Sequence, residues 1–93
     1  MSKVSRITPT LPSATEANLI EDVRKMGAAL RELLQRIGTH IDEQHEHAQS
    51  TRDLAEMERL QEADPLRWHA DATRSLSAGI MYAQRAMEQP AAF

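Results

Sequence analysis

The chain has 93 residues, enough for one small domain, and a net charge of −3 at pH 7. A negative net charge argues against a protein that binds DNA or RNA by neutralising many phosphates, whereas a small anionic ligand needs only a few placed cations. The chain has no cysteine, which excludes disulfides and thiolate chemistry. Because it also lacks a signal-like segment and a long apolar run, the sequence predicts a soluble cytoplasmic protein with no membrane partner.

Residues 1–12 lack hydrophobic periodicity and contain Pro9 and Pro12, which favour extended backbone, so we expect an N-terminal arm. Ser13 followed by Glu16 is typical of a helix N-cap with a capping box. A helix over about 14–45 is expected to follow. Its apolar residues recur in steps of three and four along one stripe: Leu19, Ile20, Val23, Met26, Leu30, Leu33, Leu34, Ile37 and Ile41.

The stripe then fades, and we interpret about 46–63 as a polar bend that can include one short further turn. Asp64 and Pro65 predict a new helix, with Asp at the N-cap and Pro at the first helical position. This helix is expected over about 65–88, with a tail at 89–93. Two amphipathic helices joined by a reversal predict an all-α fold, in which an antiparallel helical hairpin domain (13–93) follows the extended arm.

A single hairpin of this size leaves much of its apolar stripe uncovered, since a domain this small buries only about 60–65% of its unfolded surface. We therefore expect homo-oligomerisation to complete the core. Gly27 and Gly38 are eleven residues apart and lie on nearly the same side of the first helix. Each costs up to about 1 kcal/mol relative to Ala, which suggests that another helix or a ligand approaches there. Gly79 has the same predicted role in the second helix; simple tolerance of glycine is the alternative.

The candidate chemistry is sparse. His40, His45 and His47 do not have the i, i+4 spacing of helical metal ligands, so we expect them on a solvated face and predict neither a metal nor a cofactor. No serine is framed by glycines as in a nucleophile turn, so an enzyme is not expected. Trp68 and Tyr82 can stack on a base, although Trp68 is more simply explained as the core anchor of the hairpin.

Arginines on both helices offer planar donors suited to phosphate. The cations considered are Arg24, Lys25, Arg67, Arg74 and Arg85. The alternative for the second helix is a set of ion pairs within the helix, because Asp71 and Glu88 lie three residues from Arg74 and Arg85.

Several of these residues together resemble a family of small phage proteins, the anti-CBASS sponges, which share a hairpin domain with a class of Thoeris anti-defence proteins. The C-terminal half carries Trp68, Leu76, Gly79-Ile80-Met81, Arg85-Ala86, Pro90 and Phe93 at the family's spacings, with Ile80 where the family has Phe. The N-terminal half is similar through Glu16-x2-Leu19-Ile20-x2-Val23-Arg24-x2-Gly27. The resemblance covers about residues 7–41 and 64–93, and the segment 42–63 has no counterpart.

The resemblance implies a non-enzymatic protein of viral immune evasion. Such a protein binds cyclic di- or trinucleotide second messengers in the cytoplasm of the bacterial host and prevents activation of CBASS-type immune effectors. It implies a homo-oligomer, a hexamer, with nucleotide pockets between protomers and no DNA or RNA polymer as partner. A helical protein-interaction adaptor or inhibitor with no small-molecule ligand is the alternative, and an enzyme that degrades the messenger is a third hypothesis.

Carried over by position, the family's ligand-contacting lysine corresponds to Arg24. The tyrosine of its arm falls near Pro9, so Pro9 or Leu11 is expected to cover a base face instead. A basic residue of its second helix falls on Thr73, beside Arg74. The expected ligand-binding set is therefore Pro9, Leu11, Arg24, Lys25, Gly27, Ala28, Thr73 and Arg74.

Overall fold

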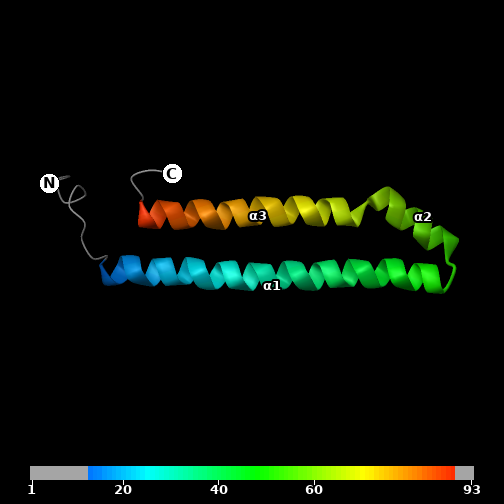
Figure 1. Ribbon diagram of the computed structural model, residues 1–93, viewed down its shortest axis with the longest axis horizontal. Coiled ribbons are helices and arrows are strands. Elements are labelled where there is room, and N and C mark those ends of the chain that lie inside the picture. Colours follow the sequence, from blue (N-terminus) through cyan, green and yellow to red (C-terminus); the bar gives the residue numbers. More distant parts are fainter. Residues whose placement is uncertain (1–12, 90–93) are drawn as a thin grey trace.

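A computed structural model of the chain describes residues 13–89, and within that range it contains three α-helices and no β-strand. These are α1 (Ala14–Ser50), α2 (Leu54–Ala63) and α3 (Pro65–Glu88). α3 runs back alongside α1 in the opposite direction, and α2 forms the turn at the far end (Figure 1). The molecule is a rod of 68 × 21 × 17 Å. The predicted all-α class is confirmed for the residues described.

α1 begins where the sequence predicts. Ser13 is extended (φ −63°, ψ 166°), and its Oγ accepts a hydrogen bond of 3.1 Å from the N–H of Glu16. This bond satisfies one of the backbone donors that a helix N-terminus leaves free. The C-terminus of α1 lies farther along than expected, at Ser50, where the hydroxyl of Thr51 donates to the carbonyl of His47 at 2.8 Å.

The expected polar bend over 46–63 is the main difference between the sequence analysis and the structure. α1 continues to Ser50, residues 54–63 form α2, and only 51–53 remain outside a helix. The side chain of Asp53 accepts the N–H of Glu56 at 3.1 Å and so caps α2. Leu60, only 3% exposed, anchors α2 in the core, so one buried side chain and one cap are enough to define this helix.

The junction between α2 and α3 is a single residue. Asp64 adopts the left-handed conformation (φ 50°), and its N–H donates to the carbonyl of Leu60 at 2.9 Å, which ends α2. Pro65 then occupies the start of α3, as predicted from its fixed φ. The side chain of Asp64 makes no capping hydrogen bond, so the residue ends one helix rather than capping the next.

The buried side of α1, which faces α3 along most of its length and α2 near Ala48, follows a repeat of seven residues. The buried residues of α1 are Gly27, Leu34, Ile41 and Ala48. A spacing of seven is the repeat of a coiled coil, in which one narrow seam of a helix keeps facing its partner. α3 contributes half-buried side chains to this seam, and no residue of α3, all of which the structure describes, is fully buried.

Two of the three glycines lie where α3 approaches α1, as predicted. A Cβ atom added to Gly27 would lie 3.1 Å from Cγ2 of Ile80, and one added to Gly38 would lie 3.1 Å from Cε1 of His69. Gly79 differs, because nothing in the chain lies within 4 Å of a Cβ added there. Its predicted close contact therefore has no partner among the described residues of a single copy.

The core of one copy is thin. Among residues 13–89 the buried apolar side chains are Leu34, Ile41, Ala48 and Leu60. Ten large apolar side chains stay exposed, including Met26 at 56%, Trp68 at 64% and Tyr82 at 63%. No helix of the described part combines the length and apolar character needed to cross a bilayer.

Candidate functional site

The ligand-binding residues expected on α1 occupy one turn near its N-terminus. Arg24 is exposed, and its guanidinium lies 3.6 Å from the carboxylate of Glu21. Lys25 and Ala28 are exposed, whereas Gly27 is buried beneath Ile80. The turn therefore presents two cations to solvent, and Arg24 is held by one exposed i, i+3 ion pair of a kind that contributes about 0–1 kcal/mol.

Thr73 and Arg74 on α3 have partners within their own helix. Thr73 is half-buried, and its hydroxyl donates to the carbonyl of His69 at 2.9 Å. Arg74 forms an ion pair with Asp71, in which the arginine side chain is 75% exposed. The alternative that an ion pair within the helix holds Arg74 is therefore observed. Such an exposed pair leaves the guanidinium able to exchange Asp71 for a phosphate.

One copy does not bring the two predicted groups together. Because α1 and α3 run in opposite directions, the numbers of two facing residues add up to a constant. Gly27 faces Ile80 and Gly38 faces His69, which gives a sum of 107 in both cases. Arg74 therefore stands opposite position 33 of α1. Arg24 is nine residues away from that position, roughly 14 Å at 1.5 Å per residue. Pro9 and Leu11 lie outside the described residues.

A groove between α1 and α3 is the main recess near the predicted residues. Its volume is about 140 Å³. Its lining is mostly apolar and consists of Gly27, Leu30, Arg31, Leu34, Leu76, Ser77, Ile80, Met81 and Gln84. Ligand pockets for molecules of drug size or larger usually measure about 300–1,000 Å³. This groove is therefore too small to enclose a cyclic dinucleotide by itself.

Trp68 and Tyr82 both lie on an exposed flank of α3. They are fourteen residues apart and so share one side of the helix, with Gly79 between them. The guanidinium of Arg67 lies 5.7 Å from the centroid of the Trp68 ring, within cation–π distance. At 64% exposure Trp68 is not the core anchor of a single copy. The flank is open either to a ligand base or to another helix.

His69 is a residue that the sequence analysis missed. Its Nε2–H donates to the carbonyl of Leu34 at 2.7 Å, because a carbonyl can only accept. The imidazole occupies the space that Gly38 leaves open. His69 thus ties α3 to α1 next to Thr73. The structure pairs this half-buried histidine with Gly38, which is 31 residues away along the chain. A contact between residues so far apart leaves no local sequence pattern by which it could have been found.

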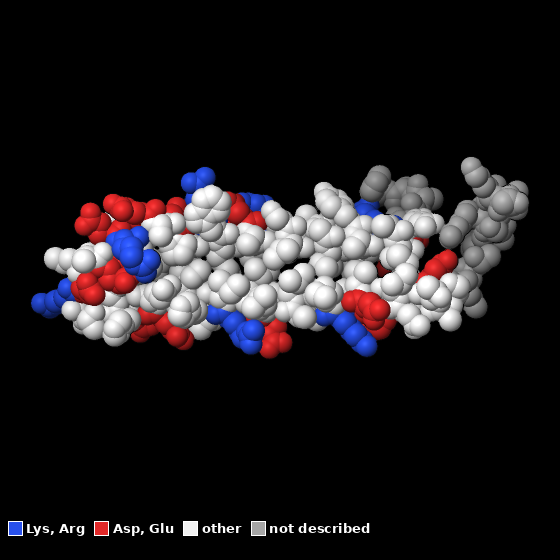
Figure 2. Space-filling model, turned by 180° about the vertical axis from the view of Figure 1, so that it is seen from behind, with Lys and Arg blue, Asp and Glu red and all other residues white. Residues whose placement is uncertain are grey.

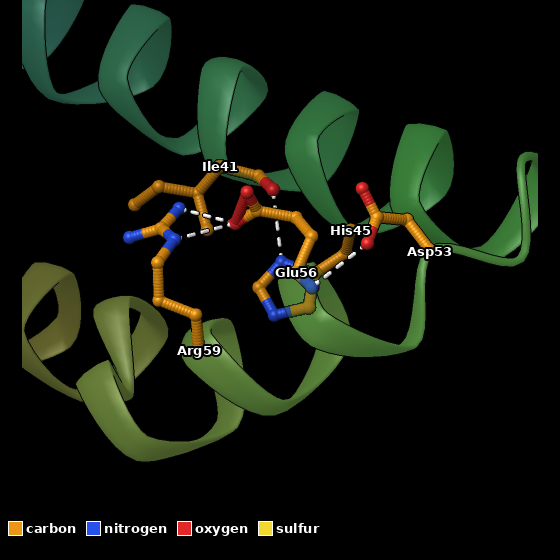
Figure 3. A network of polar contacts seen from close by, with 5 residues as sticks. All are labelled: Ile41, His45, Asp53, Glu56 and Arg59. Carbon is orange, nitrogen blue, oxygen red and sulfur yellow. Dashed lines mark hydrogen bonds and ion pairs between the residues drawn. The ribbon is translucent and has the colours of Figure 1, made fainter.

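Among the histidines of α1, His45 is half-buried and has a structural partner near the end of the rod, whereas His40 and His47 are exposed. The Nδ1–H of His45 donates to the carbonyl of Ile41 at 2.9 Å, beside the capped start of α2 (Figure 3). Arg59 donates its Nε–H to Glu56 at 2.7 Å in the same network (Figure 3). Across residues 13–89, no group of three or more possible ligand side chains could hold a metal ion.

Charge is distributed unevenly along the rod. Residues 42–64 carry eight Asp and Glu residues and two arginines, a net charge of −6, whereas the rest of the chain carries +3. Acidic side chains accordingly gather at the end formed by α2, on the left of Figure 2. The cations predicted to bind phosphate lie away from this acidic end, where an anion meets less repulsion.

Neither a protein family model nor the sequence of a curated protein matches this chain.

Proposed function

We propose that this protein is a non-enzymatic, oligomeric sponge of bacteriophage origin. It binds cyclic di- or trinucleotide second messengers and thereby prevents activation of CBASS-type immune effectors of the host. The proposal starts from the resemblance of the sequence to the anti-CBASS sponges, which includes Arg24, Gly27, Trp68 and Gly79. Two further arguments support it. One comes from the positions of the cations and the size of the groove, and the other comes from the affinity that sequestration requires.

The observation that carries the proposal is a mismatch between cations and cavity. Arg24, Lys25 and Arg74 are exposed, and Arg24 and Arg74 are held only by exposed ion pairs that a phosphate can replace. Yet none of the three lines the groove between α1 and α3, which encloses only about 140 Å³. Because one copy does not gather these cations around a cavity of sufficient size, we infer that the nucleotide pocket includes surfaces from more than one copy, as in a hexamer or another closed oligomer.

Affinity leads to the same requirement. Effective sequestration needs sub-micromolar to nanomolar binding, about −8 to −12 kcal/mol. Charge-assisted hydrogen bonds from a few arginines contribute about 1.5–3 kcal/mol each, which is only part of that total. Burial of the bases between protomers supplies the remainder, so ligand binding and assembly are coupled.

Calorimetry against a panel of cyclic di- and trinucleotides tests the proposal. We expect at least one ligand to bind with a sub-micromolar dissociation constant, and recovery of that ligand intact after denaturation excludes a degrading enzyme. Arg24→Ala should weaken binding while the assembly persists. Arg59→Ala is the matched control, because Arg59 forms the same kind of i, i+3 ion pair at the acidic end. If no ligand binds more tightly than about 10 μM, a level well short of useful sequestration, the sponge proposal is wrong.

The alternative, a helical adaptor that binds another protein, is favoured by one observation. Ten large apolar side chains are exposed on the described part of the chain, and such a surface can enter a groove of a partner protein. The adaptor predicts a monomer or dimer that binds none of the nucleotides, so the same calorimetry, combined with a mass measurement, separates the two functions.

A further inference from the structure

α1 carries a second apolar face beside the one that packs on α3, and α3 covers it only in part. Leu19, Met26, Leu33 and Ile37 are exposed by 45%, 56%, 42% and 41%. Val23 and Leu30 lie between them and are half-buried. These six residues, called here the outer face of α1, extend from Leu19 to Ile37, eighteen residue steps or about 27 Å of helix. In a coiled coil of only two helices, such positions would be polar.

The outer face has its own seven-residue repeat. Leu19, Met26 and Leu33 are seven apart, and Val23, Leu30 and Ile37 are seven apart, so the six alternate in steps of four and three. Those steps are the a and d positions of a heptad, the pattern of a helix that packs against another helix with the same repeat. This seam lies beside the buried one at Gly27 and Leu34, and Leu30, which lines the groove against α3, borders both. Its occupant is therefore a helix with a matching heptad.

We propose that the occupant is α1 of a second copy, packed antiparallel with its centre near Ala28. In this register the whole face is paired: Leu19 meets the partner's Ile37, Val23 meets the partner's Leu33, and Met26 meets the partner's Leu30. Each contact occurs twice because the pair is symmetric. No apolar residue of the face is left over, so the repeat is complementary to itself.

The charges that border the outer face select this orientation. Asp22, Ala29 and Arg36 lie seven apart along one edge, and neither Asp22 nor Arg36 forms an ion pair with any other residue in the range 13–89. The antiparallel register places Asp22 beside the partner's Arg36 on both sides of the symmetry axis. Ala29 then meets the partner's Ala29 at the axis, where a small side chain permits close approach. A parallel pair in register gives neither charge an opposite partner, and flanking charges are what set coiled-coil orientation.

The area approaches the size that a specific contact requires. The four exposed side chains present on the order of 300 Å² of surface per copy, which is the size of the largest apolar patch on many monomers, a patch that is often functional. Two copies together bury on the order of 600 Å² from these side chains alone, and Val23, Leu30 and the charged edge bring the total toward the roughly 1,000 Å² of a specific interface. The exposed Met81 of the neighbouring groove extends the same apolar surface.

Disulfide trapping tests the register, because the chain has no native cysteine. Leu19→Cys and Ile37→Cys variants, one carrying a mass tag, are oxidised separately and as a mixture. We expect the mixed covalent dimer to dominate, since positions 19 and 37 meet only between antiparallel copies. Within one chain they are about 27 Å apart and cannot be bridged. Asn18→Cys with Thr39→Cys is the matched control pair, exposed on another side of α1, and should crosslink far less.

Dimers of Leu19→Cys with itself would overturn the proposal in favour of a parallel pair, and crosslinking no stronger than that of the control pair would also overturn it. A charge swap gives an independent readout by sedimentation. Asp22→Arg should raise the dissociation constant of the pair on the order of tenfold by placing two arginines together, and adding Arg36→Asp should restore it to within about threefold. Failure of the double swap to restore association contradicts the register.

This inference shares with the proposed function only the need for assembly. Nucleotide binding measured on the same variants keeps the two separable. Intact ligand binding without the predicted crosslink would overturn the pairing alone. The predicted crosslink without ligand binding would support the pairing and contradict the sponge.

Discussion

Gly79 is the position at which a single substitution most clearly separates one copy from an assembly. In one copy a Cβ added there meets nothing within 4 Å, and the position is exposed, so a side chain can leave the helix there toward solvent. Replacing a glycine inside a helix then stabilises the isolated chain by about 0.5–1 kcal/mol. For a domain of this size 1 kcal/mol corresponds to roughly 4–8 °C in melting temperature, so the melting temperature of the dilute monomer should rise by a few degrees.

The effect on an assembly has the opposite sign. If another copy packs on the flank of α3 that carries Trp68, Gly79 and Tyr82, leucine overpacks that contact by about 1–3 kcal/mol. The association constant should then fall by roughly 5- to 150-fold. Thermal unfolding at a dilute and a concentrated condition, together with the molar mass at each, measures both effects.

Ala70→Leu is the control, because Ala70 is exposed on a different side of α3. It should leave the association constant unchanged. The reasoning about this flank is refuted if Gly79→Leu raises the melting temperature equally at both concentrations and the mass does not change. That result would mean that the glycine is tolerated in the helix rather than required by a contact.

Three further substitutions test the fold. Leu60→Ala should destabilise the chain by about 2–4 kcal/mol, because it removes the buried anchor of α2. Hydrogen exchange should show the loss of amide protection first in residues 54–63. Protection of α2 equal to that of the wild type would contradict the anchoring role of Leu60. Asp53→Ala should lower the free energy of unfolding by about 0.5–2 kcal/mol, since it removes the cap on the N–H of Glu56. Urea unfolding measures this loss, with Asp53→Asn as a conservative control that keeps an acceptor. Equal stability of the two variants would count against the cap. His69→Ala should destabilise the chain by about 1–3 kcal/mol, because the imidazole fills the space above Gly38 and donates to the carbonyl of Leu34. Adding Gly38→Ala should recover part of that lost stability. Strictly additive effects in the double-mutant cycle would disprove the contact between His69 and Gly38.

The elements with strong local signals were predictable from sequence. Ser13 began α1 and Pro65 began α3 as expected, because capping and proline geometry act within a few residues. The last turn of α1 and α2 were missed because Ala48 continues the buried repeat of α1 with only a small side chain and Leu60 is the one buried residue of α2, so neither segment shows a strong apolar stripe. A polar segment rich in good helix formers is compatible with either a bend or a helix until its packing partner is known.

The candidate site was less accessible to sequence reasoning. Gly27 and Gly38 indicated a close approach, and the structure identifies its partners as Ile80 and His69, more than 30 residues away along the chain. The predicted cations were found exposed, but Arg24 and Arg74 are separated along the rod. A periodic pattern encodes which side of a helix is apolar; it does not encode which helix, in which copy, will cover it.

The most direct test of the central idea is the molar mass of the purified protein from sedimentation equilibrium, over a concentration range on either side of the micromolar dissociation constants typical of weak self-association. The account predicts that the 10.5-kDa chain sediments as a discrete oligomer through most of that range, and that a bound cyclic nucleotide extends the oligomer to lower concentrations. A mass of one chain at every concentration, with and without nucleotide, would contradict it.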